Sequence, residues 1–314
     1  MRVAIVGAGG VGGTLAVRLA TSGHEVWLGV RGAHAAAIRE RGLELLGHDG
    51  PSRAAPGAFR VLGPGSTPEA PVELLVLAVK AFDLEEAVDG ARALLSPETA
   101  VLPLQNGIDA AERVRARAPE ARVLGGSARV VASLESPGVV RASTPLGLVL
   151  GALEPRDGEA ARRAAEALAV PGVKVSLSPD VRLPLWTKFI FICGFSGMTA
   201  LCRTSVGPVL AAPESAAMLE ATMREVEALA RARGLPLPPD VTLEQLAIGR
   251  KMDPSVTPSM LGDLRRGKRL ELDHLNGAVV RLARESGIPA PCNLAVVAGL
   301  RPWANGADNG PPRS

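Results

Sequence analysis

The chain has 314 residues, of which 47% are hydrophobic, 21% are charged and 3% are aromatic. A chain of this length is more typical of two domains than of one. The formal net charge is +3 and the longest basic cluster, residues 265–269, is short, so we expect no nucleic-acid partner, because such proteins carry denser basic stripes with aromatic residues among them.

Short apolar runs alternate with helical patterns through the first half of the chain. The expected strands are 3–6, 25–30, 74–79, 100–104 and 122–125, and the expected helices are 11–22, 33–41, 85–95 and 110–117. The Gly- and Pro-rich stretch 47–71 is expected to hold loops and a short edge strand at 59–62. This alternation predicts an α/β domain of the Rossmann type, built on a doubly wound parallel sheet.

The pattern becomes helical after about residue 178. The expected helices are 183–201, 213–233, 241–251, 259–266, 270–286 and 293–300. We therefore predict a nucleotide-binding Rossmann domain over 1–178 and an all-helical domain over 179–301 that binds substrate and carries the catalysis. The Gly-, Pro- and Asn-rich tail, 302–314, is predicted to be disordered.

A glycine-rich motif follows the first strand and opens the first helix. It has the form G-x-G-x-x-G, and its strand–turn–helix context predicts a dinucleotide site. The first glycine permits a tight turn, the second lets the backbone approach a pyrophosphate, and the third lets helix and strand pack closely. The cofactor loop is expected to comprise Gly7, Ala8, Gly9, Gly10, Val11 and Gly12.

The residue at the end of the second strand indicates which dinucleotide binds. An NAD site usually presents Asp or Glu there, whereas this strand ends in Arg31. A guanidinium would hold a 2′-phosphate with charge-assisted hydrogen bonds. We therefore expect NADPH, although Arg31 could also be an ordinary surface arginine.

Other residue patterns bear on disulfides, metal binding and the cellular location of the protein. Cys193, Cys202 and Cys292 form no Cys-x-x-Cys pair, and the histidines are scattered, so we expect neither a disulfide framework nor a metal site. The amino terminus does not resemble a signal peptide, and no apolar run is expected to reach membrane-spanning length. We predict a cytoplasmic protein without a membrane partner.

Several motifs together resemble the ketopantoate reductase (2-dehydropantoate 2-reductase) family, from residue 1 to about 300. They are Ala-Val-Lys at 78–80, Gln-Asn-Gly at 105–107, Leu-Trp-x-Lys at 185–188, Ser-Met-Leu-x-Asp at 259–263 and Glu-Leu-Asp-x-Leu-Asn-Gly at 271–277. The resemblance implies that Lys188 is the general acid. It also implies that Asn106 and Ser259 contact substrate. Lys80 and Glu271 would lie at the nicotinamide end of the cofactor, and we expect Asn106 to contact the cofactor as well.

Elementary chemistry supports the role that the resemblance gives to Lys188. Reducing a ketone needs a hydride donor and a proton donor at the nascent alkoxide. The chain has no tyrosine, and apolar neighbours such as Trp186 and Phe189 would make Lys188 release its proton more readily. Each of these residues could instead have only a structural role. Lys188 could be a structural lysine, Lys80 could merely end a strand, and Asn106 could be a turn residue. Ser259 and Glu271 could simply begin helices.

The helix that carries Lys188 departs from the family pattern. Family members usually have asparagines four and eight residues after the lysine, on the same helix face. This chain has Ile192 and Ser196 there, and we expect both to line the substrate pocket. Gly194 and Gly197 in the same helix are expected to allow close backbone approach. These differences leave the identity of the substrate open.

We thus predict reduction of 2-dehydropantoate to pantoate by NADPH, as in pantothenate biosynthesis. One alternative is the same chemistry on another 2-oxo acid or ketone, for which Ile192 is the evidence. Another is a non-catalytic NADPH-binding sensor, although such a protein would have no need of the general acid at Lys188. A homodimer is compatible with the helical second half, but no apolar stripe specifies one.

Overall fold

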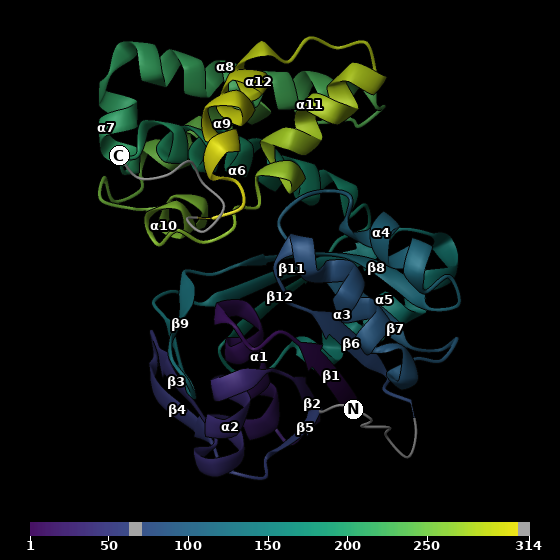
Figure 1. Ribbon diagram of the computed structural model, residues 1–314. Helices are drawn as coiled ribbons and strands as arrows, with labels where there is room; N and C mark the ends of the chain where they lie inside the picture. The colour runs from purple at the N-terminus through teal and green to yellow at the C-terminus, as the bar shows by residue number, and fades with distance from the viewer. Residues whose placement is uncertain (63–70, 307–314) are drawn as a thin grey trace. The chain divides into compact units, whose positions relative to one another are not determined.

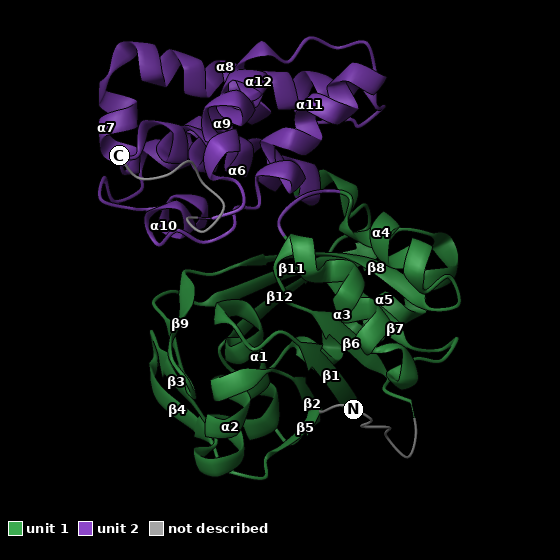
Figure 2. Cartoon of the chain, in the orientation of Figure 1, with its two compact units in different colours: residues 1–105, 109–184 green, residues 106–108, 185–314 purple. Residues whose placement is uncertain are grey.

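The computed structural model describes residues 1–62 and 71–306, which form two compact units (Figure 2). Unit 1 contains Met1–Gln105 and Asp109–Pro184. Unit 2 contains Leu185 onward and also the short segment Asn106–Ile108, which belongs to the first half of the sequence. The substrate residue predicted at 106 therefore lies in the unit that also holds Lys188.

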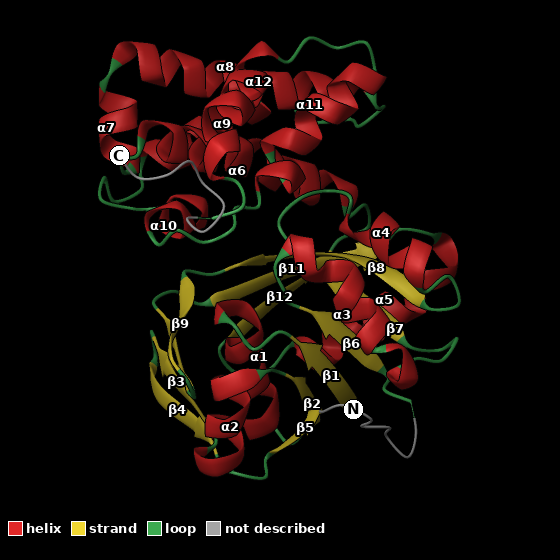
Figure 3. Ribbon diagram, in the orientation of Figure 1, coloured by secondary structure: helices red, strands yellow, loops and turns green. Residues whose placement is uncertain are grey.

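The main sheet of unit 1 has the strand order β12-β11-β8-β7-β6-β1-β2-β5 (Figures 1 and 3). Its six strands from β8 to β5 are parallel, whereas β11 runs antiparallel to β8. This is the order of a dinucleotide-binding sheet, which reverses its direction of winding between β1 and β6. The strands are β1 (Arg2–Val6), β2 (Glu25–Gly29), β5 (Phe59–Leu62), β6 (Leu74–Leu77), β7 (Ala100–Pro103), β8 (Arg122–Arg129), β11 (Leu146–Ala152) and β12 (Val173–Leu177).

Helices cover both faces of this sheet, so neighbouring residues of one strand enter different cores. Val3 and Ile5 of β1 pack in one apolar cluster with Leu15, whereas Ala4 packs in a second cluster with Leu84. This alternation follows from the two-residue period of a strand, and it confirms the predicted doubly wound fold. The helices are α1 (Gly10–Thr21), α2 (Gly32–Arg41), α3 (Leu84–Gly90), α4 (Ala110–Arg117) and α5 (Gly158–Leu168).

A second, smaller sheet of unit 1 was not expected from the sequence. Its order is β4-β3-β10-β9, formed by β3 (Leu43–Gly47), β4 (Gly50–Ala54), β9 (Ala132–Ser136) and β10 (Val139–Ala142). The prediction of only loops and an edge strand over 47–71 is wrong at β4, although the edge strand β5 is confirmed. A β4 sequence of Gly-Pro-Ser-Arg-Ala has no strand signature, and its pairing with β3 in a hairpin supplies the structure.

The regular secondary structure in the described residues of unit 2 is all helical, as predicted. Its helices are α6 (Arg182–Cys202), which begins in the last residues of unit 1, α7 (Val206–Ala211), α8 (Pro213–Ala232), α9 (Val241–Arg250), α10 (Ser259–Arg265), α11 (Asn276–Glu285) and α12 (Pro291–Leu300). α6 is also long and apolar enough to cross a membrane by length and composition, contrary to the sequence expectation, but 61% of its apolar window is buried inside the protein. Such burial is typical of a core helix.

Two of the predicted helices are each divided into an α-helix and a 3-10 turn. The expected helix 270–286 is a 3-10 turn, Leu272–His274, followed by α11, because Leu275 adopts φ −108° and ψ −107° and interrupts the helix. The expected helix 85–95 ends at Gly90 and continues as a 3-10 turn, Arg92–Leu94.

The predicted disordered tail is ordered at its start. Arg301–Trp303 forms a 3-10 turn, and Ala304 is buried. The Ala304 carbonyl accepts a hydrogen bond from the Leu270 amide at 2.9 Å, so this segment is tied to the rest of unit 2. The remainder of the predicted tail, 307–314, lies outside the described residues.

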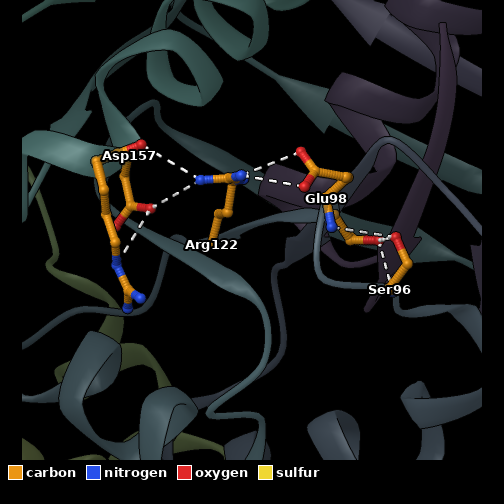
Figure 4. A network of polar contacts seen from close by, with 6 residues as sticks. Ser96, Glu98, Arg122 and Asp157 are labelled. Atoms are coloured by element: carbon orange, nitrogen blue, oxygen red, sulfur yellow. Dashed lines mark hydrogen bonds and ion pairs between the residues drawn. The ribbon is translucent and has the colours of Figure 1, made fainter.

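A polar network lies where β8 begins (Figure 4). The Arg122 guanidinium donates to both carboxylate oxygens of Glu98 at 3.1 Å. Its other end lies 3.9 Å from an oxygen of Asp157, a carboxylate that is only 1% exposed. Neither Asp157 oxygen has a hydrogen-bond partner, and burial raises the pKa of this carboxyl.

Candidate active site

The glycine-rich loop connects β1 to α1 with a geometry that only glycine permits. Gly7 has φ +99°, and a Cβ built on it would lie 2.8 Å from the backbone of Ala78 in the neighbouring strand connection. At Gly12 a Cβ would lie 1.9 Å from the Gly7 carbonyl oxygen, so helix and strand touch there. The tight turn and the close packing inferred from the motif are both present.

Gly9 leaves the amino terminus of α1 open. It occupies the N-cap position of α1, and no side chain caps the first amides of the helix. A Cβ built on Gly9 meets no atom within 4 Å. The backbone here is accessible to a ligand, and unsatisfied N–H groups at a helix amino terminus favour an anion.

The loop borders a cavity of about 720 Å³ within unit 1. The cavity lies at the carboxyl ends of β1 and β2, which is where open α/β sheets bind their ligands. Its volume and its polar groups suit a nucleotide. The residues that matter for its chemistry are Gly7, Ala8, Gly9, Arg31, His34, Arg39 and Glu86.

Arg31 lies in this cavity, at the amino terminus of α2. Its Nη1 lies 2.8 Å from Oε1 of Glu86 on α3, and the two side chains are 72% and 67% exposed. The structure thus brings Arg31 and the glycine-rich loop to one cavity. Sequence reasoning missed Glu86, because α3 is remote from α2 in the chain and carries no motif that marks it.

The segments that follow β6 and β7 carry Lys80 and Asn106. Lys80 is half-buried and precedes a 3-10 turn, Ala81–Asp83. Gln105 is buried and donates to the carbonyls of Leu77 and Val79 at 3.0 and 3.1 Å. This amide therefore fixes the end of β6 just before Lys80, a positioning role that the sequence motif did not reveal.

Lys188, Ile192 and Ser196 all lie on α6 at intervals of one helical turn. This spacing places them along one helix face. Lys188 and Ile192 are half-buried, and Ser196 is 7% exposed. Their predicted contacts with substrate stay predictions.

The two glycines of α6 allow its close packing. A Cβ on Gly194 would lie 2.4 Å from Cγ of Met223 on α8, and one on Gly197 would lie 2.9 Å from the amide atoms of Asn276 on α11. The expectation of close backbone approach is confirmed. A larger side chain at either position would collide with Met223 or Asn276, so that neighbour or α6 would have to shift.

A buried amide network holds α6 against three other helices. Asn276 donates to the Cys193 carbonyl of α6 at 3.0 Å and to Oδ1 of Asn293 on α12 at 2.9 Å. The Asn293 side chain in turn donates to Glu225 on α8 at 2.8 Å. Because Asn276 and Asn293 are both 0% exposed, these bonds fix the helix that carries Lys188.

The remaining predicted site residues lie in unit 2. Ser259 is exposed and is the first residue of α10, whereas Glu271 is 6% exposed and precedes the 3-10 turn before α11. Asp263 of the same motif is buried and accepts a hydrogen bond from Arg266 at 2.9 Å. Asn106, Lys188, Ser259 and Glu271 therefore share one compact unit, and their catalytic roles stay predictions.

A Rossmann-type sheet with an open glycine-rich loop, followed by a helical unit, is the architecture of a dinucleotide-binding protein. Comparison with known families supports this class and narrows it. Residues 3–155 match the model of ketopantoate reductase PanE/ApbA, and residues 180–303 match the model of its C-terminal part. The chain belongs to the ketopantoate reductase family.

Individual relatives cover almost the whole chain. The 2-dehydropantoate 2-reductase of Mycobacterium tuberculosis is 30% identical over 312 residues, covering 98% of each chain. A crystal structure of a PanE/ApbA family ketopantoate reductase from Ralstonia eutropha JMP134 is 33% identical, with a TM-score of 0.87, and covers 97% of this chain and 98% of its own. D-mandelate dehydrogenase, solved with NADH and anilino(oxo)acetate, shares the fold at 23% identity and a TM-score of 0.89, covering 97% and 98% of the two chains.

Proposed function

We propose that this protein reduces 2-dehydropantoate to pantoate with NADPH. The observation that carries the proposal is the cavity in which Arg31 and the open glycine-rich loop lie together. The relatives named as 2-dehydropantoate 2-reductases support the choice of substrate. Relatives in this family are named as reductases, so the alternative of a non-catalytic sensor loses its support. A cytoplasmic location and a homodimer stay predictions from the sequence.

The residues of unit 1 fit the dinucleotide. The amides at the amino terminus of α1 would receive the pyrophosphate, and Arg31 would receive the 2′-phosphate of the adenosine ribose. A 2′-phosphate has to compete with Glu86 for this guanidinium, since the two side chains already pair at 2.8 Å. When bound, NADPH supplies the hydride that adds to the ketone carbon.

Unit 2 supplies the proton in this proposal. Lys188 donates its Nζ proton to the oxygen of the former ketone as the hydride adds to the carbon, so the product is a secondary alcohol. Asn106 and Ser259 bind the substrate. Lys80 and Glu271 position the nicotinamide end of the cofactor. The family resemblance supports these roles.

A second candidate substrate is a more apolar 2-oxo acid of similar size. It is favoured by Ile192, which offers only apolar surface one helical turn from Lys188. A buried hydroxyl of 2-dehydropantoate without a partner there would cost ~1–3 kcal/mol. Ser196, one turn further along α6, can still offer a hydrogen bond, and this favours 2-dehydropantoate as the first candidate.

One assay separates the candidates. NADPH oxidation is followed with 2-dehydropantoate and with a panel of 2-oxo acids that differ in size and polarity. The proposal expects the highest kcat/KM for 2-dehydropantoate. A higher kcat/KM for an apolar 2-oxo acid would favour the second candidate, and the absence of turnover with the whole panel would contradict both.

A further inference from the structure

His34 is a buried histidine of α2 whose two ring nitrogens both have backbone partners. The residue is 9% exposed; its Nε2 lies 2.9 Å from the Ala8 carbonyl oxygen, and its Nδ1 lies 2.9 Å from the Gly138 nitrogen. Ala8 belongs to the glycine-rich loop, and Gly138 to the turn between β9 and β10. One side chain therefore joins three segments that are distant in the sequence.

These partners determine the protonation of the ring. The Gly138 N–H can only donate, so Nδ1 accepts and carries no proton. The Ala8 carbonyl can only accept, so Nε2 carries the proton and donates it. Burial also lowers the pKa of His34 below its usual 6.5, which agrees with a neutral ring. His34 is thus held as a single tautomer.

The bond to Ala8 fixes the orientation of the peptide group between Ala8 and Gly9. In a trans peptide the carbonyl and the following N–H point in opposite directions. Since the His34 ring holds the Ala8 carbonyl, the Gly9 N–H is directed away from the ring. Gly9 lines the cavity and has open space beside its Cα, so an anion can approach the loop there.

The bond to Gly138 ties the β9–β10 hairpin to the same loop. A Cβ on Gly10 would lie 2.4 Å from the carbonyl oxygen of Ala132, so the start of β9 touches the start of α1. Leu134 of β9 lines the cavity. The hairpin therefore contributes Leu134 to the cavity lining, and His34 connects this hairpin to the glycine-rich loop.

We propose that His34 is the positioning residue of the dinucleotide site, which orients the Ala8–Gly9 peptide for the pyrophosphate. The inference rests on the proposed assignment of this cavity to the dinucleotide. His34 acts through the loop and takes no part in proton or hydride transfer. Changing it should therefore alter cofactor affinity and leave kcat at saturating cofactor unchanged.

Two substitutions separate the two hydrogen bonds. In His34→Asn the amide oxygen takes the place of Nδ1, which keeps the bond to Gly138 and loses the bond to Ala8. In His34→Gln the amide nitrogen takes the place of Nε2, which keeps the bond to Ala8. Kd values for NADPH and NADH are measured by fluorescence titration, and KM and kcat for the 2-oxo acid are measured at saturating cofactor.

We expect His34→Asn to raise both dinucleotide Kd values about tenfold, the size of one lost hydrogen bond. His34→Gln should stay within about threefold of wild type, and both variants should keep the wild-type kcat and KM for the 2-oxo acid. His48→Asn is the matched control, since His48 lies in the exposed turn between β3 and β4, and it should bind as the wild type does.

Three results would overturn the role of His34: normal binding by His34→Asn, weaker binding by His34→Gln alone, or a fall in kcat at unchanged Kd. Gly9→Val tests the site itself, because its side chain would enter the cavity and should prevent binding. Normal binding by Gly9→Val would contradict the proposed site. Lost binding in Gly9→Val together with normal binding in His34→Asn would contradict only the inference about His34.

Discussion

Arg31 and Glu86 form an ion pair at 2.8 Å in the cavity beside the glycine-rich loop. The pair joins the residue after β2, which selects between the two dinucleotides in folds of this kind, to a carboxylate from α3. Both side chains are mostly exposed, so the pair itself stabilises the fold by little. Its importance lies in ligand selection, because a 2′-phosphate is attracted by one member and repelled by the other.

The first prediction concerns Arg31. Arg31→Ala should raise the Kd for NADPH at least tenfold, because a charge-assisted hydrogen bond to phosphate contributes ~1.5–3 kcal/mol. The Kd for NADH should hardly change, since NADH lacks the 2′-phosphate. Fluorescence titration of both cofactors checks this. Equal affinity of the wild type for NADPH and NADH would contradict the proposed preference.

The second prediction concerns Glu86. Glu86→Gln removes the carboxylate that pairs with Arg31 and should lower the Kd for NADPH about three- to tenfold, the effect of removing a like charge near the surface. NADH affinity should stay constant. Glu40→Gln, an exposed change on α2, is the control. If Glu86→Gln weakened NADPH binding, the carboxylate would be supporting Arg31 and not competing for it.

The third prediction tests the general acid. Lys188→Ala should lower kcat by a factor of about 10²–10⁴, the usual contribution of a positioned proton donor, with little change in NADPH affinity. Pre-steady-state measurement of NADPH oxidation gives the rate of hydride transfer directly. Lys251→Ala, an exposed lysine that directly follows α9 in the same unit, should be neutral. Near-normal turnover of Lys188→Ala would remove this residue from the mechanism.

The fourth prediction tests the apolar position on α6. Ile192→Asn should lower the KM for 2-dehydropantoate, because an amide can bond the substrate hydroxyl; one recovered bond corresponds to about tenfold. KM for apolar 2-oxo acids should rise in the same variant. Steady-state kinetics with both substrate types provide the test. An unchanged ranking of substrates would show that Ile192 does not line the pocket.

The fifth prediction concerns Asp157 and the dependence of stability on pH. Burial raises the pKa of this carboxyl, so the folded state favours its protonated form more than the unfolded state does. The stability that the protonated carboxyl contributes is fully present when the pH is below 3.8, the usual pKa of the group. It is lost as the pH rises through the raised pKa of the folded state. At neutral pH the ionised side chain therefore lowers the free energy of unfolding.

Asp157→Asn should accordingly raise the Tm at pH 7–8 by roughly 2–4 °C, the shift expected for a gain of about 1 kcal/mol. The two arginines that face Asp157 still have partners in this variant, so neither is left without an ion pair. Arg122 keeps its bonds to Glu98, and Arg156 keeps its pair with Glu154 at 2.8 Å. The gain should vanish near pH 3, where the wild-type carboxyl is protonated as well. Asp89→Asn, which removes an exposed ion pair, is the control; a lower Tm of Asp157→Asn at pH 7–8 would contradict the argument.

Local sequence patterns determined most of the architecture. The four-residue apolar run of β6, Leu-Leu-Val-Leu, is buried on both faces as a central parallel strand, and the long helical patterns of unit 2 became helices. The glycine-rich motif also predicted its own geometry, because φ +99° at Gly7 and the contact at Gly12 follow from residues a few positions apart. Short-range sterics and hydrophobic periodicity are encoded in contiguous residues, so they can be read from the sequence.

Only the tertiary structure decided which distant segments meet. β10 pairs in parallel with β3, Glu86 reaches Arg31, and Gly138 donates to His34 across 104 positions of sequence. Asn106 belongs to the helical unit although it follows a strand of the first one. No local pattern marks these partners, because each contact exists only after folding has closed the chain between them, and the choice of partner depends on the packing of the whole unit.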